Sequence, residues 1–374
     1  MIPPLKIAML SFYLPSENKI GSGYQAHYMA NALARRGHAV TMFAPVPKPD
    51  DALYHLERIP VGNKLRILRF AKNLRRIDFS PFDVLHAHGE DYLLYTRKHP
   101  IHVRTMHGSC LAEALHVPRL KEKLRMLMIG CTEFAAYLAA DATVGVSQNT
   151  SRSYPWIKRT ILNGVDTSAF FPAPQKDPDP TILFVGTYQN RKRGKLLMDA
   201  FASTIRPQLP SAKLWMVCND APQAPGVEVL GKLSTPDLAD RYRRAWAFCL
   251  PSSYEGFGVP YIEAMASGTP VVATPNPGAK EVLANGKFGL LCPPDQLGQT
   301  LLALLQSPED RARLTTLALQ RTQDFAWPTI AAQYESLYTQ LMPTKTEPST
   351  NVHESTQMLP RLSPAPAAAA APHE

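Results

Sequence analysis

The sequence lacks any long hydrophobic run. No stretch of its 374 residues approaches the roughly 18 to 20 apolar residues that a membrane-spanning helix needs. The N-terminal segment MIPPLKIAMLSFYLP has no basic n-region and meets polar residues at once, so we expect no signal peptide there. These absences argue against an integral membrane protein.

Cysteine is scarce as well. Five cysteines are scattered along the chain, and none belongs to a C-x-x-C pair. Such usage suits a reducing compartment, where most of these thiols act as small core residues. We therefore expect a cytoplasmic protein.

Several catalytic signatures are missing. The chain has no G-x-S-x-G motif, no P-loop and no H-E-x-x-H motif. Gly21 and Gly23 form only a G-x-G, and no acidic residue caps the second strand, so the dinucleotide fingerprint is incomplete. His86 and His88 share one strand face and could approach His107, but they lack a spaced acidic or cysteine partner. We therefore predict no metal site and no cofactor.

Positive charge is present in excess, but only in the first half. Residues 1–170 hold 22 Lys and Arg against 13 Asp and Glu, whereas the remainder holds 18 of each. The segment KLRILRFAKNLRRI, residues 64–77, combines helical apolar spacing with six basic side chains. Two interpretations remain open: a helix on an anionic membrane surface, or an ordinary solvated helix. No nucleic-acid motif accompanies the charge, so nucleic acid is not a predicted partner.

Strands alternate with helices along the chain, which predicts an α/β protein with parallel sheets. We expect a first domain over 1–170, a proline-rich linker over 171–180 and a second domain over 181–342. The closing helix, 329–341, is assigned to the second domain, and packing back on the first domain is left open. Residues 343–374 are rich in Pro, Ser, Thr and Ala, and this composition predicts a disordered tail. Further strands are expected at 6–15, 39–45, 83–88, 102–108, 142–147, 181–187, 212–218, 226–231, 247–253 and 270–274, and further helices at 26–38, 195–204, 235–245 and 260–267.

Two glutamates mark the bend LPSSYEGFGVPYIEAMASG. Gly256 and Gly258 permit close backbone approach, and the helix that begins near Pro260 offers free N–H groups to an anion. A diphosphate could rest there, over residues 256–259. Glu255 and Glu263 would repel a phosphate, so their natural partners are hydroxyls. An anion site between two hydroxyl acceptors predicts a nucleotide-sugar.

The basic segment QNRKRGK, residues 189–195, follows the strand ILFVGT at its carboxyl end. Its charges can neutralise a diphosphate, although a basic loop is more often a solvated surface. His107 stands at a strand end and is placed to contact a substrate; a satisfied core histidine is the alternative.

An ordered set of motifs now resembles the family 4 glycosyltransferases, retaining enzymes of the GT-B fold. The segments are GSG with ANALARRGHAV, FDVLHAHG, TMHG, ADATVGVS, LNGVDTSAFFP, ILFVGT, LGKLSTPDLADRYRRAWAFCLPSS and PSSYEGFGVPYIEAMASGTPVVATPNPGAKEVL. The family pattern has two glutamates separated by seven residues, which Glu255 and Glu263 match. The resemblance covers almost the whole folded chain. It implies two doubly wound Rossmann-like domains that face a deep cleft. It also implies a nucleoside diphosphate sugar donor and no obligatory metal.

The resemblance assigns roles residue by residue. Glu255 would contact the hydroxyls of the donor sugar, and Glu263 would bind the ribose. Gly21 and Gly23 would lie near the donor phosphates, and His107 near the reacting sugar. The backbone of Gly256, Phe257, Gly258 and Val259 would lie against the sugar and diphosphate, and His88 and Asn163 would line the cleft.

Two positions depart from the family pattern. In the family, an arginine usually follows the glycine at the end of the strand ILFVG, and a lysine stands six positions later. In this sequence these two positions hold Thr187 and Arg193. Arg193 can grip a diphosphate in bidentate geometry, with Arg191 or Lys192 replacing the missing arginine.

We therefore predict transfer of a hexose-type sugar to a hydroxyl acceptor in glycan or glycolipid assembly. Two kinds of acceptor stay open: one that is lipid-linked at the inner face of a membrane, and a soluble one. The alternative is a catalytically idle GT-B protein that binds a sugar or nucleotide. A phosphorylase or epimerase of the same fold ranks lower, because a phosphorylase is usually a much longer chain with a pyridoxal phosphate lysine.

Overall fold

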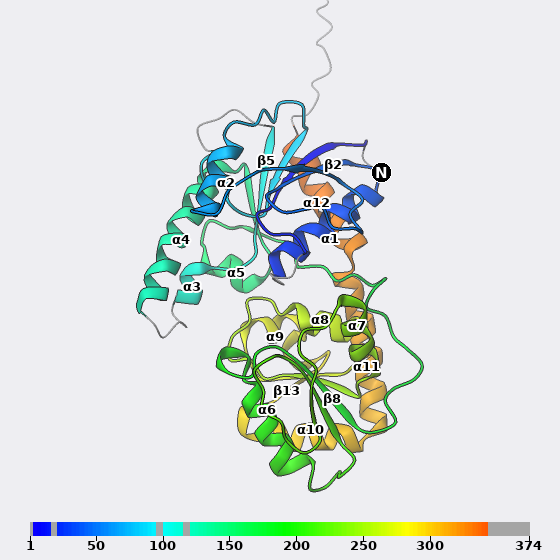
Figure 1. Cartoon of the computed structure of the whole chain (residues 1–374). Helices are drawn as coiled ribbons and strands as arrows, with labels where there is room; N and C mark the ends of the chain where they lie inside the picture. Colours follow the sequence, from blue (N-terminus) through cyan, green and yellow to red (C-terminus); the bar gives the residue numbers. More distant parts are fainter. Residues whose placement is uncertain (1–2, 16–20, 95–99, 115–119, 343–374) are drawn as a thin grey trace, which may run out of the picture. The chain divides into compact units, whose positions relative to one another are not determined.

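The computed structural model describes residues 3–15, 21–94, 100–114 and 120–342. The tail predicted to be disordered, 343–374, lies outside the described residues. Within these ranges the chain forms two parallel sheets, each with helices against it (Figure 1). No described helix is long and apolar enough to cross a bilayer.

The first sheet has seven strands in the order β3-β2-β1-β4-β5-β6-β7, the doubly wound order. Neighbouring strands pair in parallel throughout. Its strands are β1 (Lys6–Leu10), β2 (Ala39–Ala44), β3 (His55–Arg58), β4 (Val84–Ala87), β5 (Ile101–Met106), β6 (Ala142–Gly145) and β7 (Arg159–Thr160), and its helices are α1 (Gly21–Arg35), α2 (Arg66–Leu74), α3 (Cys110–Ala114), α4 (Leu120–Ala139) and α5 (Gln148–Ser153).

The second sheet repeats this plan with six parallel strands in the order β10-β9-β8-β11-β12-β13. Its strands are β8 (Thr181–Val185), β9 (Lys213–Val217), β10 (Val227–Val229), β11 (Ala247–Leu250), β12 (Val271–Ala273) and β13 (Leu290–Leu291). The helices of this half are α6 (Gly194–Ala200), α7 (Thr235–Arg244), α8 (Val259–Ala266), α9 (Pro277–Val282), α10 (Leu297–Gln306), α11 (Pro308–Thr322) and α12 (Trp327–Leu341), with a 3₁₀ turn, η1 (Asn190–Lys192), after β8. Two doubly wound sheets confirm the predicted α/β, GT-B-type fold.

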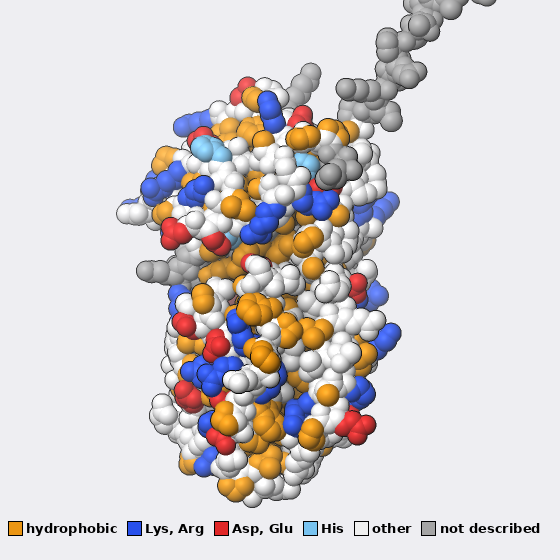
Figure 2. Space-filling model, turned by 90° about the vertical axis from the view of Figure 1, so that its right-hand side faces the viewer, with side chains coloured by type: hydrophobic (Ala, Val, Ile, Leu, Met, Phe, Trp, Pro, Cys, Tyr) orange, Lys and Arg blue, Asp and Glu red, His pale blue; other side chains and the backbone are white. Residues whose placement is uncertain are grey.

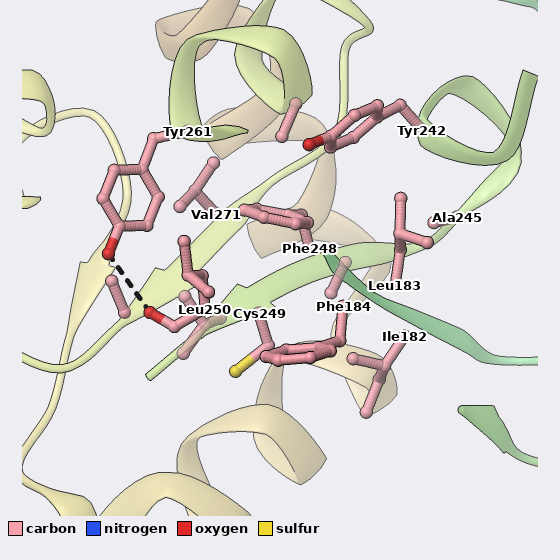
Figure 3. Packing of buried hydrophobic residues seen from close by; sticks show 14 of the residues in the cluster. Ile182, Leu183, Phe184, Tyr242, Ala245, Phe248, Cys249, Leu250, Tyr261 and Val271 are labelled. Carbon is pink, nitrogen blue, oxygen red and sulfur yellow. Dashed lines mark hydrogen bonds between the residues drawn. The ribbon is translucent and has the colours of Figure 1, made fainter. Parts of the chain in front are cut away.

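Buried strands form the core of the second half. Phe184 on β8 and Phe248 on β11 are both fully buried, and Figure 3 shows them among Ile182, Leu183 and Val271. The hydroxyl of Tyr261 on α8 donates to the carbonyl of Leu250, 3.2 Å away, and so fixes α8 on the end of β11. This contact positions the glutamate-bearing bend between the two elements.

The sequence analysis shortened α1. It also predicted neither the strands β3, β7 and β13 nor the helices α3, α4, α5, α9, α10 and α11. β3 reads HLER, an edge strand without the apolar alternation that marks a strand. The expected GSG loop is instead the first turn of α1, which begins at Gly21. A Cβ at Gly23 would lie 2.8 Å from the carbonyl carbon of Tyr13, so only glycine lets the helix begin this close to the segment after β1.

Helix α12 returns to the first half of the chain. It contacts α1 and β5, and Figure 1 shows it beside α1. The carboxylate of Glu335 accepts hydrogen bonds from Arg36 at 2.5 and 2.6 Å and lies 2.9 Å from His38. A bidentate pair of this kind is stronger than a single ion pair. It ties the end of the described chain to α1.

Candidate functional site

A cavity of about 470 Å³ is lined by residues from both halves of the chain. The residues that follow β5, β8 and β11 line it, together with the first turns of α1 and α8. Ligands of open α/β sheets bind at the carboxyl ends of the strands, which is where these residues stand. The cavity is therefore the candidate site.

The bend after β11 is held in place by backbone contacts. Gly258 has φ of 95°, in the left-handed region, and caps α8. The N–H of Gly278 donates to the carbonyl of Glu255 at 2.9 Å, and a Cβ there would lie 2.3 Å from the carbonyl oxygen of Phe257. A Cβ built at Gly256 meets nothing within 4 Å. The bend is packed on one side and open toward the cavity on the other.

Glu255 is buried and paired with two cations. Its Oε1 lies 3.1 Å from Nη1 of Arg191 and 2.8 Å from Nζ of Lys192. Burial raises the pKa of Glu255, but Lys192 and Arg191 outweigh burial, and the pKa lies below its usual value. Glu255 is thus an ionised hydrogen-bond acceptor, not an acid, at neutral pH.

Glu263 lines the same cavity from the second turn of α8. The hydroxyl of Tyr242 donates to its Oε2 at 3.0 Å. Burial and the charge of Glu263 raise the pKa of Tyr242 well above its usual value, so this hydroxyl keeps its proton. Tyr242 therefore fixes the orientation of the carboxylate.

Two helices begin at the cavity. Gly21 and Ser22 from the first turn of α1 and Val259 and Pro260 from that of α8 line it. The unpaired N–H groups of a helix start and the helix dipole favour an anion. Arg191 and Lys192 line the same cavity, which is therefore suited to a diphosphate.

His107 enters the cavity from the end of β5. Its Nε2 lies 2.9 Å from Nδ1 of His88, which does not itself line the cavity. Burial and, to a lesser extent, the positive charge of Arg104 together lower the pKa of His107 to about 4. Burial likewise lowers the pKa of His88, so both rings are neutral at pH 7.

His86 is a satisfied core histidine. Its Nδ1 lies 2.6 Å from the hydroxyl of Tyr338 and its Nε2 lies 2.8 Å from Oγ1 of Thr105. Among the residues that the structure describes, no three His, Cys, Asp or Glu side chains converge as a metal site.

The basic segment divides between two surfaces. Arg191 and Lys192 line the cavity, whereas Arg193 has φ of 54° and faces a separate hollow beside Tyr188 and Lys195. Thr187 is exposed and donates to the carbonyl of Gln189 at 2.9 Å. The turn η1 decides this placement, because it directs consecutive side chains to different sides.

The structure brings most of the predicted residues to one cavity. They are Gly21, His107, Asn163, Arg191, Lys192, Glu255, Gly256, Phe257, Gly258, Val259 and Glu263. Gly23, His88 and Arg193 do not line it. Gly23 packs against Tyr13, and His88 lies behind His107.

Sequence reasoning missed two tyrosines of α1 and one aspartate. Tyr24, Tyr28 and Asp166 all line the cavity. Burial raises the pKa of Tyr28 above its usual value, and Asp166 raises it further. The spacing of Tyr24 and Tyr28, four residues apart directly after GSG, is the signal that could have revealed them.

Comparison with known families agrees with this geometry. Residues 21–169 match the model of Glycosyltransferase Family 4, and residues 179–307 match that of Glycosyl transferases group 1. The chain is a glycosyltransferase of the family 4 type.

Individual relatives of this glycosyltransferase match most of the chain or about half of it. A phosphatidyl-myo-inositol mannosyltransferase from Mycolicibacterium smegmatis is 26% identical over 87% of this chain and 92% of its own. A D-inositol 3-phosphate glycosyltransferase from Thermobispora bispora is 30% identical, over 49% of this chain and 50% of its own.

Solved structures share the fold. The sucrose-phosphate synthase of Thermosynechococcus elongatus superposes with a TM-score of 0.74 at 24% identity, over 90% of this chain and 99% of its own. HepE from Anabaena, solved in complex with UDP-glucose, superposes with a TM-score of 0.68 at 17% identity, over 90% of this chain and 100% of its own. At these identities the likeness concerns the fold alone.

Proposed function

We propose that the glycosyltransferase moves a hexose-type sugar from a nucleoside diphosphate to a hydroxyl acceptor, with retention of the anomeric configuration. One observation carries the proposal: two helix starts, two cations and two carboxylates share a single cavity. The helix starts with Arg191 and Lys192 suit the diphosphate, and Glu255 and Glu263 suit the sugar and ribose hydroxyls.

The cations would change partners when the donor binds. Without a donor, Arg191 and Lys192 neutralise Glu255. A diphosphate between the helix starts would attract both cations and free Glu255 to accept from the sugar's hydroxyls. The same cations would then stabilise the negative charge that grows on the diphosphate as it leaves. No metal is needed for that task.

Retention is inferred from the family resemblance. Glu255 is held ionised, so it would stabilise positive charge that develops at the anomeric carbon. The leaving phosphate would help to take the proton of the acceptor, which attacks on the same face. His107, neutral and buried, would hydrogen-bond the reacting sugar.

The acceptor is proposed to be lipid-linked, at the cytoplasmic face of a membrane, in glycolipid or glycan assembly. The relative named phosphatidyl-myo-inositol mannosyltransferase supports this class of acceptor. So does α2, where Arg66, Arg69 and Lys72 are exposed beside exposed Leu65 and Leu68. Such a helix suits an anionic membrane surface.

The alternative function, that of a catalytically idle binding protein, was supported mainly by Thr187, which stands where the family usually has an arginine. That support weakens, because Arg191 and Lys192 bring two cations to the cavity although Thr187 is exposed. The proposal is tested by incubating the protein with a panel of nucleotide sugars and measuring the release of nucleoside diphosphate. NMR of the product with a hydroxyl acceptor then gives its anomeric configuration. Folded protein that binds donors but releases no diphosphate would contradict the proposal.

A further inference from the structure

Helix α4 presents a continuous apolar stripe to solvent. Its members recur every three or four residues and therefore share one face of the helix. Leu120 is 71% exposed, Met128 70% and Leu138 64%. A contiguous apolar surface of this kind marks an interaction site, whereas single exposed leucines do not. The stripe consists of Leu120, Leu124, Leu127, Met128, Cys131, Phe134 and Leu138.

Basic side chains border this stripe. Lys121, Lys123 and Arg125 are exposed on the N-terminal turns of α4, and helical spacing places Lys121 and Lys123 on opposite edges of the stripe. Both carboxylates of the helix, Glu122 and Glu133, fall on the other face and are half-buried. The exposed face of α4 is therefore apolar in the centre, basic at its edges and free of acidic residues.

The opposite face fixes the helix to the protein. Gly130 is buried, and a Cβ there would lie 2.6 Å from Leu111 on α3. Ala136 and Ala139 are buried as well, and the hydroxyl of Tyr154 donates to Glu133. The apolar stripe is thus held rigidly outward.

Helices α2 and α4 belong to one surface. Figure 1 shows both on the left-hand side of the N-terminal half. The electrostatics agree, because the charges of Arg66 on α2 and Arg125 on α4 both lower the pKa of Tyr13. Burial raises the pKa of Tyr13, Glu90 raises it further, and the two guanidinium groups lower it. Figure 2 shows the molecule turned by 90°, so that the right-hand side of Figure 1 faces the viewer. Basic, acidic and apolar side chains are interspersed on that face.

We propose that α4 lies in the plane of an anionic membrane, with its apolar stripe in the boundary between headgroups and acyl chains. A helix with an apolar face and basic edges takes this orientation. The 20 residues of α4 carry too many charges to cross the bilayer. The proposal adds an inserted element to the electrostatic contact of α2, and it holds whichever donor the enzyme uses.

A second copy of the chain is the other candidate occupant. Two such stripes packed together would desolvate the basic edges of both helices without supplying an acidic partner. An anionic lipid surface offers both an apolar layer and negative charge. Charge complementarity therefore favours the membrane.

The experiment uses the full-length chain with vesicles of phosphatidylcholine and phosphatidylglycerol. The double variant Leu124→Ser, Met128→Ser is expected to lower the vesicle partition coefficient at least about tenfold, because it removes two inserted side chains. Leu53→Ser, at a leucine that is 56% exposed on another part of the first half, is the matched control and should stay within about twofold of the wild type. Circular dichroism confirms that each variant is folded.

A second measurement reads the depth of α4 directly. An environment-sensitive dye on Cys131, which is exposed within the stripe, should shift to the blue on vesicles and be quenched by lipids that carry a quencher on the acyl chain. Cys131→Ser gives the blank. Vesicle binding without quenching, or equal binding by the double variant, would overturn the proposal. So would a concentration-dependent dimer in sedimentation without lipid that the double variant abolishes. Donor hydrolysis is measured alongside. If the folded wild type hydrolyses no donor, the proposed function is contradicted, but the membrane proposal is not.

Discussion

Nδ1 of His88 lies 2.9 Å from Nε2 of His107. Burial keeps both rings neutral at pH 7, so one imidazole donates and the other accepts. Whichever donates, this bond decides which nitrogen of His107 carries its proton. It thereby decides whether the ring offers a donor or an acceptor to the cavity.

Replacing His88 should therefore act on the reaction through His107. His88→Phe keeps a flat ring and removes the hydrogen bond, and we expect kcat to fall about three- to tenfold, the value of one neutral hydrogen bond. The donor KM should change little, because His88 does not line the cavity. His88→Asn, which places a polar atom near the position of Nδ1, should restore part of kcat. Equal losses in both variants would show that the ring serves packing alone.

Glu263 is expected to bind the ribose. Glu263→Ala removes one charged hydrogen-bonding group and should cost about 1.5 to 3 kcal/mol of affinity for the nucleoside diphosphate. Tyr242→Phe is the control, because it removes only the hydroxyl that orients the carboxylate and should cost less. Calorimetry measures both affinities. Unchanged affinity in Glu263→Ala would contradict the assignment.

The neighbours Lys192 and Arg193 provide a matched pair. Lys192 lines the cavity and Arg193 faces the other hollow. Lys192→Ala should weaken binding of the nucleoside diphosphate about tenfold or more and spare the free nucleoside, since a charged hydrogen bond is lost. Arg193→Ala should leave both affinities nearly unchanged. The reverse order would show that the diphosphate binds on the Arg193 side.

Vesicle binding should depend on the charges of α2. Replacing Arg66, Arg69, Lys72 and Arg75 by Gln should remove most of the salt-sensitive binding to anionic vesicles, because each basic side chain contributes about 1 kcal/mol near such a surface. Donor hydrolysis should be unchanged. If the wild type ignores anionic vesicles at low salt, α2 is only a solvated helix.

Buried histidines predict a loss of stability in acid. Burial lowers the pKa of His86 to about 3 and that of His107 to about 4, below the unfolded value of about 6.5. Between these values the unfolded chain binds more protons, so the free energy of unfolding should fall as the pH drops below about 6.5. Each histidine contributes up to about 1.4 kcal/mol per pH unit in that range. Urea unfolding from pH 7 to pH 5 measures the slope; a flat profile would contradict the burial.

The sequence alone was sufficient for the fold class and for most of the residues that line the cavity. Strands such as KIAML and TILFV are apolar runs followed by polar or glycine-rich ends, and this pattern predicts parallel strands with a site at their carboxyl edge. The residue types next to Glu255 also predict the bend there. Gly256 and Gly258 before Pro260 permit few arrangements other than a strand-to-helix turn.

Tertiary structure decided which neighbours of these residues serve the site. The sequence could not separate Lys192 from Arg193, because the turn η1 and the left-handed φ of Arg193 determine which side chain meets Glu255. The sequence also could not show that His88 lies behind His107. The two histidines are 19 residues apart and follow different strands, β4 and β5. The sequence analysis expected no helix over residues 120–139, and periodicity does not show what covers a helix face. The open stripe of α4 therefore became visible only in three dimensions.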